Sequence, residues 1–290
     1  MKPSFAIVGC GKVGINLTRV LIQAGYPVSG FASRTLDSAK NAGEIAKSDN
    51  ISTEAHKITI NADIVFITTP DGIIEETCNR IAANNGFKEN AIVLHCSGSL
   101  PSTILKAAEK NGAITGSIHP LQSFATTDGE SNPFEGIIAA VEGQTKAVET
   151  GLLIAGDLKA RGFKIETNAK TMYHASAVVA SNFLVTLAEF AYNLLEVSGI
   201  DKKDAYAVLG PLIEGTLSNI KKVGPVDALT GPVVRGDVST VAEHLKEIDD
   251  KTPELTALYK ILGLHTVAIA KQRGTLTTEA ENDLLSMFQQ

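Results

Sequence analysis

The chain contains 290 residues, of which 44% are hydrophobic and 20% are charged, and its formal net charge is −6. This length allows two domains that each bury a core of their own. The composition is ordinary for a soluble globular protein. The acidic charge balance excludes attraction to nucleic acid or to an anionic membrane as the basis of function.

The cysteines and the chain start bear on the cellular compartment. Cys10, Cys78 and Cys96 are odd in number and lack metal-type spacing, which indicates reduced thiols and no metal site. A strand-like run begins at Ser4 and leaves no room for a signal peptide. No uninterrupted apolar stretch reaches the roughly 18 residues that a bilayer crossing needs. We therefore predict a cytoplasmic protein.

The first part of the chain alternates strand-like and helix-like segments. Short apolar runs of strand type are separated by stretches with helical spacing, the pattern of a doubly wound parallel sheet. The expected strands are 4–8, 28–32, 62–68, 91–94, 114–118, 136–141 and 163–166. The expected helices are 13–24, 36–46, 73–83, 101–110 and 146–160.

From about Asn168 onward, the pattern is helical throughout. The expected helices are 171–197, 203–222, 238–248, 253–272 and 278–288. We therefore predict a nucleotide-binding domain over 1–167 and a helical domain for substrate binding and dimerisation over 168–290. The long apolar helix is expected to be buried centrally and partly in a homodimer interface, because homodimers are the commonest oligomers.

A glycine pattern follows the first predicted strand. Gly9, Gly11 and Gly14 have the spacing of the dinucleotide-binding motif G-x-G-x-x-G, between a strand and a helix. Gly9 permits a tight turn, Gly11 lets the backbone approach a pyrophosphate, and Gly14 lets the helix pack on the strand. The helix N-terminus at Lys12 and Val13 supplies N–H groups to the phosphates. The pattern predicts a dinucleotide site rather than an ordinary glycine-rich turn.

The residues that follow the second predicted strand indicate which cofactor binds. NAD-binding proteins place Asp or Glu on the ribose hydroxyls about 20 residues past the loop, but this chain has Ser33 and Arg34 there. A guanidinium suits a 2′-phosphate dianion, and the serine adds a donor. We therefore predict NADP as the cofactor. In the alternative, Arg34 points to solvent and Asp37 lies nearby.

Two later strands also end in candidate ligand-binding residues. In an open parallel sheet, ligands bind beyond the carboxyl ends of the strands. Thr69 and Pro70 follow the third predicted strand, and we expect them beside the nicotinamide ribose because proline stiffens that turn. Asp71 would instead cap the next helix. Ser97 offers a hydroxyl near the reactive end of the cofactor, or forms only a turn.

His119 ends a predicted buried strand and precedes Pro120. Hydride transfer to a carbonyl leaves an alkoxide that needs a proton, and a histidine can deliver it near neutral pH. We predict a catalytic role for His119. In the alternative, its ring hydrogen-bonds backbone and holds the turn.

A second polar group begins the long helix. At about 100° per residue, Lys170, His174 and Ser181 share one helix face, and Asn182 is less well aligned. A lysine can stabilise the developing alkoxide or bind a substrate carboxylate. We predict Lys170 and His174 as catalytic and Ser181 and Asn182 as substrate-binding. The alternative is a solvated lysine and a structural histidine.

Arg235 lies in a segment shaped by glycine and proline between two predicted helices. Its guanidinium could bind an acidic substrate through two hydrogen bonds. Asp237, two residues later, would cap the helix that begins at Val238. We predict Arg235 as substrate-binding.

Four motifs together resemble a known family. They are GCGKVG at 9–14, HPLQSF at 119–124, the Lys170 and His174 pair with Ser181-Asn182, and LTGPVVRGD at 229–237. Over nearly its whole length the chain resembles a family of Rossmann-like proposed NADP oxidoreductases with a C-terminal domain of unknown function. Its plan is similar to that of ketopantoate reductase, pyrroline-5-carboxylate reductase and 6-phosphogluconate dehydrogenase.

The resemblance implies an α/β fold. A doubly wound Rossmann domain would precede an all-helical domain of the 6-phosphogluconate dehydrogenase type, with the active site in a cleft and dimerisation through the helices. In ketopantoate reductase and the hydroxyacid dehydrogenases, an asparagine follows the catalytic lysine by four residues. Lys170 matches that lysine, but His174 replaces the asparagine, and the acidic catalytic residue of ketopantoate reductase has no match. The His119-Pro120 pair resembles the histidine motif of prephenate dehydrogenase.

These features predict an NADP-dependent oxidoreductase. It would transfer hydride between nicotinamide and a small acidic carbonyl or hydroxy compound, with Lys170, His174 or His119 handling the proton. The alternatives are an imine reductase, a prephenate-dehydrogenase-like enzyme, or a non-catalytic sensor or scaffold that binds NADP.

Overall fold

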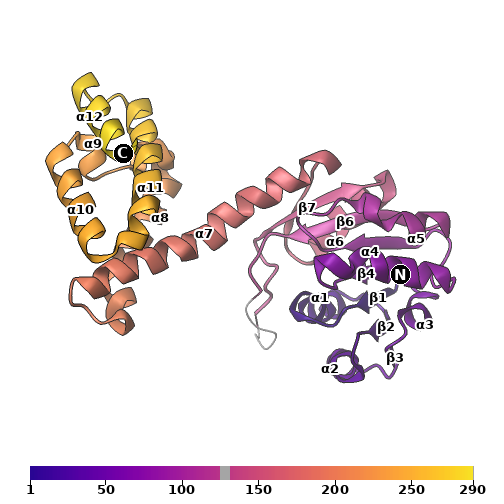
Figure 1. Cartoon of the computed structure of the whole chain (residues 1–290). Helices are drawn as coiled ribbons and strands as arrows, with labels where there is room; N and C mark the ends of the chain where they lie inside the picture. Colours follow the sequence, from indigo (N-terminus) through magenta and orange to yellow (C-terminus); the bar gives the residue numbers. More distant parts are fainter. Residues whose placement is uncertain (125–130, 290) are drawn as a thin grey trace. The chain divides into compact units, whose positions relative to one another are not determined.

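The computed structural model describes residues 1–124 and 131–289. These residues form two compact units, Met1–Ala180 and Ser181–Gln290. The predicted domain boundary at 167/168 stands just before helix α7 (Lys170–Val197), whereas the compact units divide within that helix. Figure 1 shows both units, which are described separately below.

The first unit is built on a single sheet of eight strands in the described residues. In chain order these are β1 (Phe5–Val8), β2 (Val28–Ala32), β3 (Ile51–Ser52), β4 (Ile64–Ile67), β5 (Ile92–His95), β6 (Ile114–Pro120), β7 (Ile138–Gly143) and β8 (Arg161–Lys164). The spatial order is β3-β2-β1-β4-β5-β6-β7-β8, and only the β6–β7 pair is antiparallel. The chain therefore changes direction across the sheet between β1 and β4, where α/β sheets bind ligands.

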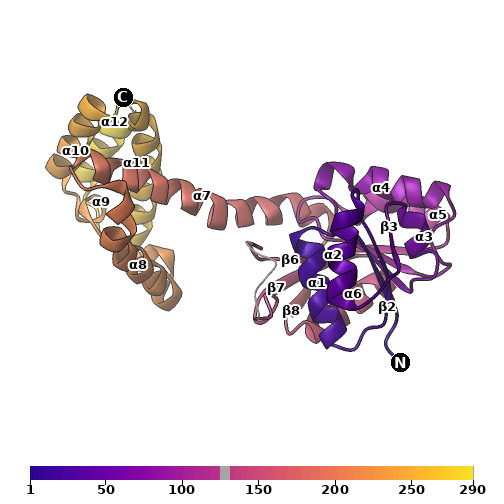
Figure 2. The ribbon, with the colours of Figure 1, turned by 90° about the horizontal axis from the view of Figure 1, so that it is seen from below.

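Both faces of the sheet are covered by helices (Figure 2). Side chains alternate along a strand, so Phe5 and Ile7 of β1 enter one core and Ala6 and Val8 enter the other. The first core is closed by α1 (Lys12–Gln23), α2 (Leu36–Ala46) and α6 (Thr145–Asp157), and the second by α3 (Ala55–Thr59), α4 (Asp71–Ala83) and α5 (Lys106–Lys110). Burial on both faces explains why the strands are continuous apolar runs.

A few elements differ from the prediction in bounds or kind. Strand β3 and helix α3 were not predicted, because two and five residues are too short to show a period. The predicted helix 101–110 is a 3₁₀ turn, Ser102–Leu105, followed by α5. Strand β8 lies two residues before its predicted position, and its largely exposed edge carries little apolar pattern.

The second unit is entirely helical in its described residues. After the end of α7 come α8 (Ala205–Ala228), α9 (Pro232–Arg235), α10 (Val238–Lys251), α11 (Pro253–Arg273) and α12 (Thr278–Gln289). Its core is small and centres on Val241, Val267, Leu284 and Phe288. Helix α8 is interrupted at Gly224, where φ is 79°, close to the predicted helix end at residue 222.

Most of helix α7 is exposed and only Lys170 and Phe190 of its described residues are buried, so the prediction of central burial is wrong for the single chain. Val179 is 57% exposed, Phe183 54% and Val185 70%. By length and composition alone, the segment Thr167–Val197 could also cross a membrane. Serine, asparagine and histidine interrupt the apolar residues of this segment, so it contains no uninterrupted apolar run of bilayer length.

Candidate active site

The predicted glycine loop joins β1 to α1 at the point where the strand order reverses. Gly9 has φ +107°, and a Cβ there would lie 2.7 Å from the backbone N of Thr69. A Cβ on Gly14 would lie 2.3 Å from the carbonyl O of Gly9. Gly11 has open space around its Cβ position and is the N-cap of α1, so no side chain caps the helix there. The N–H groups of the first turn of α1 are thus available to an anionic ligand.

A cavity of about 860 Å³ extends from this loop. Its wall includes the predicted residues Gly9, Gly11, Lys12, Val13, Ser33, Arg34, Thr69 and Pro70. Among the described residues, the Thr69 hydroxyl is a buried polar group without a hydrogen-bond partner. An open backbone cradle, an exposed Arg34 and an unpaired buried hydroxyl fit a dinucleotide, and the volume is in the range of ligand sites.

The cavity wall also contains residues that were not predicted from the sequence. Thr35 and Ser38 follow Arg34, and their hydroxyl oxygens are 2.9 Å apart. Thr77 and Arg80 reach the wall from α4. The predicted residues Gly14 and Ser97 do not line it. Gly14 is buried in α1 beneath the loop, and Ser97 belongs to the neighbouring polar network.

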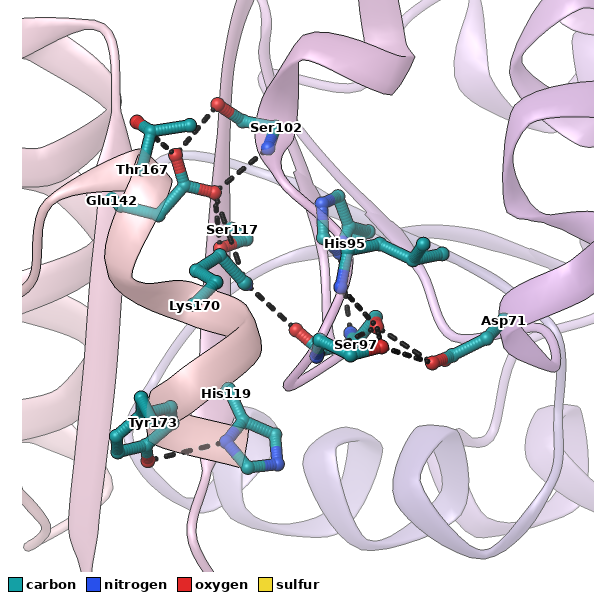
Figure 3. A network of polar contacts seen from close by, with 12 residues as sticks. Asp71, His95, Ser97, Ser102, Ser117, His119, Glu142, Thr167, Lys170 and Tyr173 are labelled. Atoms are coloured by element: carbon teal, nitrogen blue, oxygen red, sulfur yellow. Dashed lines mark hydrogen bonds and ion pairs between the residues drawn. The ribbon is translucent and has the colours of Figure 1, made fainter. Parts of the chain in front are cut away.

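A buried polar network runs across the neighbouring strands β5, β6 and β7, from the turn after β5 to Glu142 (Figure 3). Lys170, the first residue of α7, is 2% exposed and donates to the Ser97 carbonyl O at 2.8 Å and the Ser117 Oγ at 2.6 Å. Its Nζ lies 3.8 Å from Oε1 of Glu142, which is 1% exposed. Burial lowers the pKa of Lys170 to about 8 despite the opposing effect of Glu142.

Glu142 holds several segments together. Its carboxylate accepts hydrogen bonds from Ser102 N, Ser102 Oγ, Ser117 Oγ and Thr167 Oγ1, each at 2.8 Å. Burial alone would raise the pKa of Glu142, but these hydroxyl hydrogen bonds and the charge of Lys170 bring it below its usual value. The carboxylate therefore stays ionised and compensates the lysine charge.

Every polar group of Ser97 has a partner. Its backbone N donates to His95 Nδ1 at 3.2 Å, and its Oγ donates to Asp71 Oδ2 at 2.8 Å. The same Oγ accepts from the backbone N of Leu100 at 3.1 Å. Asp71, the first residue of α4, thus fixes the turn after β5. The alternative that Asp71 caps α4 is wrong, because the N-cap is Pro70 and no side chain caps the helix. Ser97 therefore both stabilises the turn after β5 and takes part in the buried polar network.

Two histidines meet at the next residue of this turn. A Cβ on Gly98 would lie 2.5 Å from His174 Cδ2 and 2.8 Å from His119 Nε2, so only glycine fits between the two rings. The ring centroids of His119 and His174 are 6.0 Å apart, and His119 Nδ1 lies 3.2 Å from the hydroxyl of Tyr173. Burial, then the charge of Lys170, lowers the pKa of His119 to about 4. His119 is therefore neutral at neutral pH.

The remaining predicted site residues belong to the second unit. Ser181 and Asn182 are exposed on α7, and Arg235 is exposed at the end of α9. Asp237 caps α10, as the alternative for that segment proposed, by accepting from Thr240 N at 3.1 Å. Glu142 was not predicted from the sequence, although a carboxylate directly after the apolar run 137–141 was the available signal.

Comparisons with known proteins agree with this architecture. Residues 2–120 match the Rossmann-like domain family, and residues 137–266 match a domain of unknown function, DUF2520. No curated protein sequence matches the chain.

Solved structures cover almost the whole chain. A proposed NADP oxidoreductase from Bacteroides fragilis is 24% identical, with a TM-score of 0.74 over 93% of this chain and 98% of its own. A protein from Thermotoga maritima is 29% identical, with a TM-score of 0.74 over 93% and 99%. A reductive aminase from Aspergillus terreus, solved with NADPH and ethyl levulinate, is 14% identical, with a TM-score of 0.65 over 99% and 100%. The predicted α/β fold with a helical C-terminal part is confirmed.

Proposed function

We propose that this protein is an NADP-dependent oxidoreductase that transfers hydride between nicotinamide and a small acidic carbonyl or hydroxy compound. The observation that carries the proposal is the single cavity that joins the glycine loop, Arg34 and Pro70 at the reversal of strand order. The fold shared with oxidoreductases supports it. When bound there, NADP would supply the hydride, and the chain would supply binding, orientation and proton handling.

Arg34 and Ser33 are the proposed recognition groups for the 2′-phosphate of the cofactor. The hydroxyls of Thr35 and Ser38 stand on the same cavity wall and can add donors. Because the guanidinium is exposed, it is free to form charge-assisted hydrogen bonds to a phosphate. Lys12 and Val13 would present the first turn of α1 to the pyrophosphate.

The cofactor assignment is tested with Arg34→Asp, measuring dissociation constants for NADP and NAD by calorimetry. We expect the preference for NADP over NAD to fall by at least about tenfold, which is about 1.4 kcal/mol. Arg161→Asp is the matched control, because Arg161 is exposed on β8 and does not line the cavity. An unchanged preference in Arg34→Asp would contradict the assignment.

His119 and His174 are the proposed catalytic groups, with Tyr173 as a hydrogen-bonded partner of His119. Since His119 is neutral at neutral pH, we propose that it acts on the substrate oxygen as a neutral hydrogen-bond donor. Lys170 is committed to buried partners. Arg235, Ser181 and Asn182 remain the proposed substrate-binding residues, as the sequence predicts, and all three are exposed.

Turnover decides among the remaining functions. NADPH oxidation is measured against a panel of 2-keto acids and cyclic imines, for the wild type and His119→Ala. We expect His119→Ala to lower ketone reduction by about 100-fold, the scale of a lost hydrogen-bond donor to the developing oxyanion. An imine reductase would lose much less, because the product amine is basic. NADP binding without any turnover would instead favour a sensor or scaffold.

We further propose a cytoplasmic homodimer. The exposed apolar side chains of α7 and α8, including Val185 and Leu212, would be buried by a second copy of the chain. Cys10, Cys78 and Cys96 are free thiols, which suits a reducing compartment.

A further inference from the structure

The turn between β5 and the following 3₁₀ helix is attached at both ends to one buried ion pair. Lys170 Nζ holds the carbonyl O of Ser97 at 2.8 Å. Glu142 holds the backbone N and the Oγ of Ser102, both at 2.8 Å. The hydroxyl of Ser117 links the two charges, since it accepts from Lys170 and donates to Glu142. We call residues 97–102 the Ser97 loop.

The amine of Lys170 has no capacity left for a substrate in this arrangement. An ammonium group has three donors, and those of Lys170 face Ser97 O, Ser117 Oγ and the Glu142 carboxylate. Neither Lys170 nor Glu142 lines the cofactor cavity. A buried ion pair is a weak source of stability, because desolvation offsets the attraction. The arrangement therefore points to control of geometry.

The geometry that this pair controls is that of the two histidines. Gly98 follows the carbonyl that Lys170 holds, and its Cβ position lies 2.5 Å from His174 Cδ2 and 2.8 Å from His119 Nε2. The backbone of Gly98 is thus in contact with both rings. A displacement of the Ser97 loop would release or displace them together.

We propose that Lys170 and Glu142 are a positioning pair: they hold the Ser97 loop and, through Gly98, set the positions of His119 and His174. Lys170 is then a positioning residue, not the catalytic residue that the sequence pattern predicts. Only the catalytic consequence of this inference rests on the proposed function, since the placement of the rings can be measured without turnover.

The test uses the full chain with isotope-labelled histidine and compares ring resonances by NMR. The variants are Glu142→Gln, Lys170→Met and the double variant Lys170→Met/Glu142→Gln. The double variant removes both charges, so that no unpaired charge is left buried, and the Glu142→Gln change retains a side-chain acceptor for Ser102 N. Lys164→Met is the matched control, an exposed lysine on β8. His265, exposed on α11, is the internal reference resonance.

We expect the resonances of His119 and His174 to move in all three variants, while the resonance of His265 stays in place. In Lys164→Met, none of these resonances should move. The dissociation constant for NADP should change by less than about twofold, because the pair does not line the cavity. The kcat should fall by about 10- to 100-fold, the scale of an ångström-level misplacement.

Two results would overturn the inference. In the first, the double variant is folded by circular dichroism and the His119 and His174 resonances stay at their wild-type positions. In the second, kcat falls but the resonances do not move, which would assign a direct chemical role to Lys170. Failure of the proposed function is a separate observation, because it would appear as a lack of turnover by the wild type.

Discussion

Single residues in this protein differ in how far their surroundings can be inferred from nearby sequence. Gly9 and Arg34 each lie in a turn directly after a strand. Their positions on the cavity wall therefore follow from elements that are adjacent in the chain. Lys170 was also singled out from the sequence, but its surroundings were not foreseen. Its partners Ser97 and Ser117 are 73 and 53 positions away, and no local pattern indicates them.

Buried His95 makes the stability of the protein depend on pH. It is fully buried, its Nδ1 accepts from Ser97 N, and burial lowers its pKa from 6.5 to about 4. Between these two pKa values, His95 is protonated in the unfolded chain but neutral in the folded chain. The stabilising contribution is therefore fully present above pH 6.5 and is lost as pH falls toward 4.

We expect His95→Asn, which keeps an acceptor for Ser97 N, to lose less stability than the wild type between pH 6.5 and 4. The difference should reach a few kcal/mol at the acid end, measured by urea unfolding at a series of pH values. His265→Asn is the control, because His265 is exposed. Parallel pH profiles for wild type and His95→Asn would contradict this role of His95.

Elements were predictable where their periodicity was long, and less so where it was short or weak. The strands of the parallel sheet and the helices of both units follow from apolar runs and helical spacing. Strand β3 is too short to show a pattern, and β8 is an exposed edge. Helix α7 shows that an apolar composition predicts a helix but not its burial, because burial depends on what packs against it.

The N-cap of α10 is a local sequence signal whose contribution to the free energy of unfolding can be predicted. Asp237 accepts hydrogen bonds from the backbone N and the hydroxyl of Thr240. Asp237→Ala removes this cap and should lower the free energy of unfolding by about 1 kcal/mol. Urea unfolding followed by circular dichroism measures the change. Glu243→Ala, an exposed change within the same helix, should leave stability nearly unchanged; an equal loss in both variants would rule out the cap as the cause.

At the scale of the whole molecule, α7 and α8 expose apolar side chains that the proposed second copy would cover. Val185 on α7 is 70% exposed and Leu212 on α8 is 67% exposed. Leaving such side chains in water forgoes the free energy of burying them, about 25 cal/mol per Å². A second copy and a lipid bilayer are both able to cover α7, so the two must be separated by experiment.

We expect the wild type to sediment as a dimer at micromolar concentration. Val185→Glu and Leu212→Glu should each shift it toward monomer without loss of helicity, because both side chains are exposed in the single chain. Leu153→Glu is the control, since Leu153 is 71% exposed on α6 in the other unit. A monomeric wild type would contradict the dimer, and co-flotation with lipid vesicles would assign α7 to a membrane.

The sequence by itself determined the alternation of strands and helices, the glycine loop and the charge at Arg34. Each of these depends on periodicity or on neighbours within one turn. The tertiary structure alone decided that Lys170 is buried against Glu142 and that Gly98 stands between His119 and His174. These residues meet because the strand register pairs His95 of β5 with Ser117 of β6, and Ser117 with Glu142 of the antiparallel strand β7. The order of the strands thus brings together segments that are far apart in the chain.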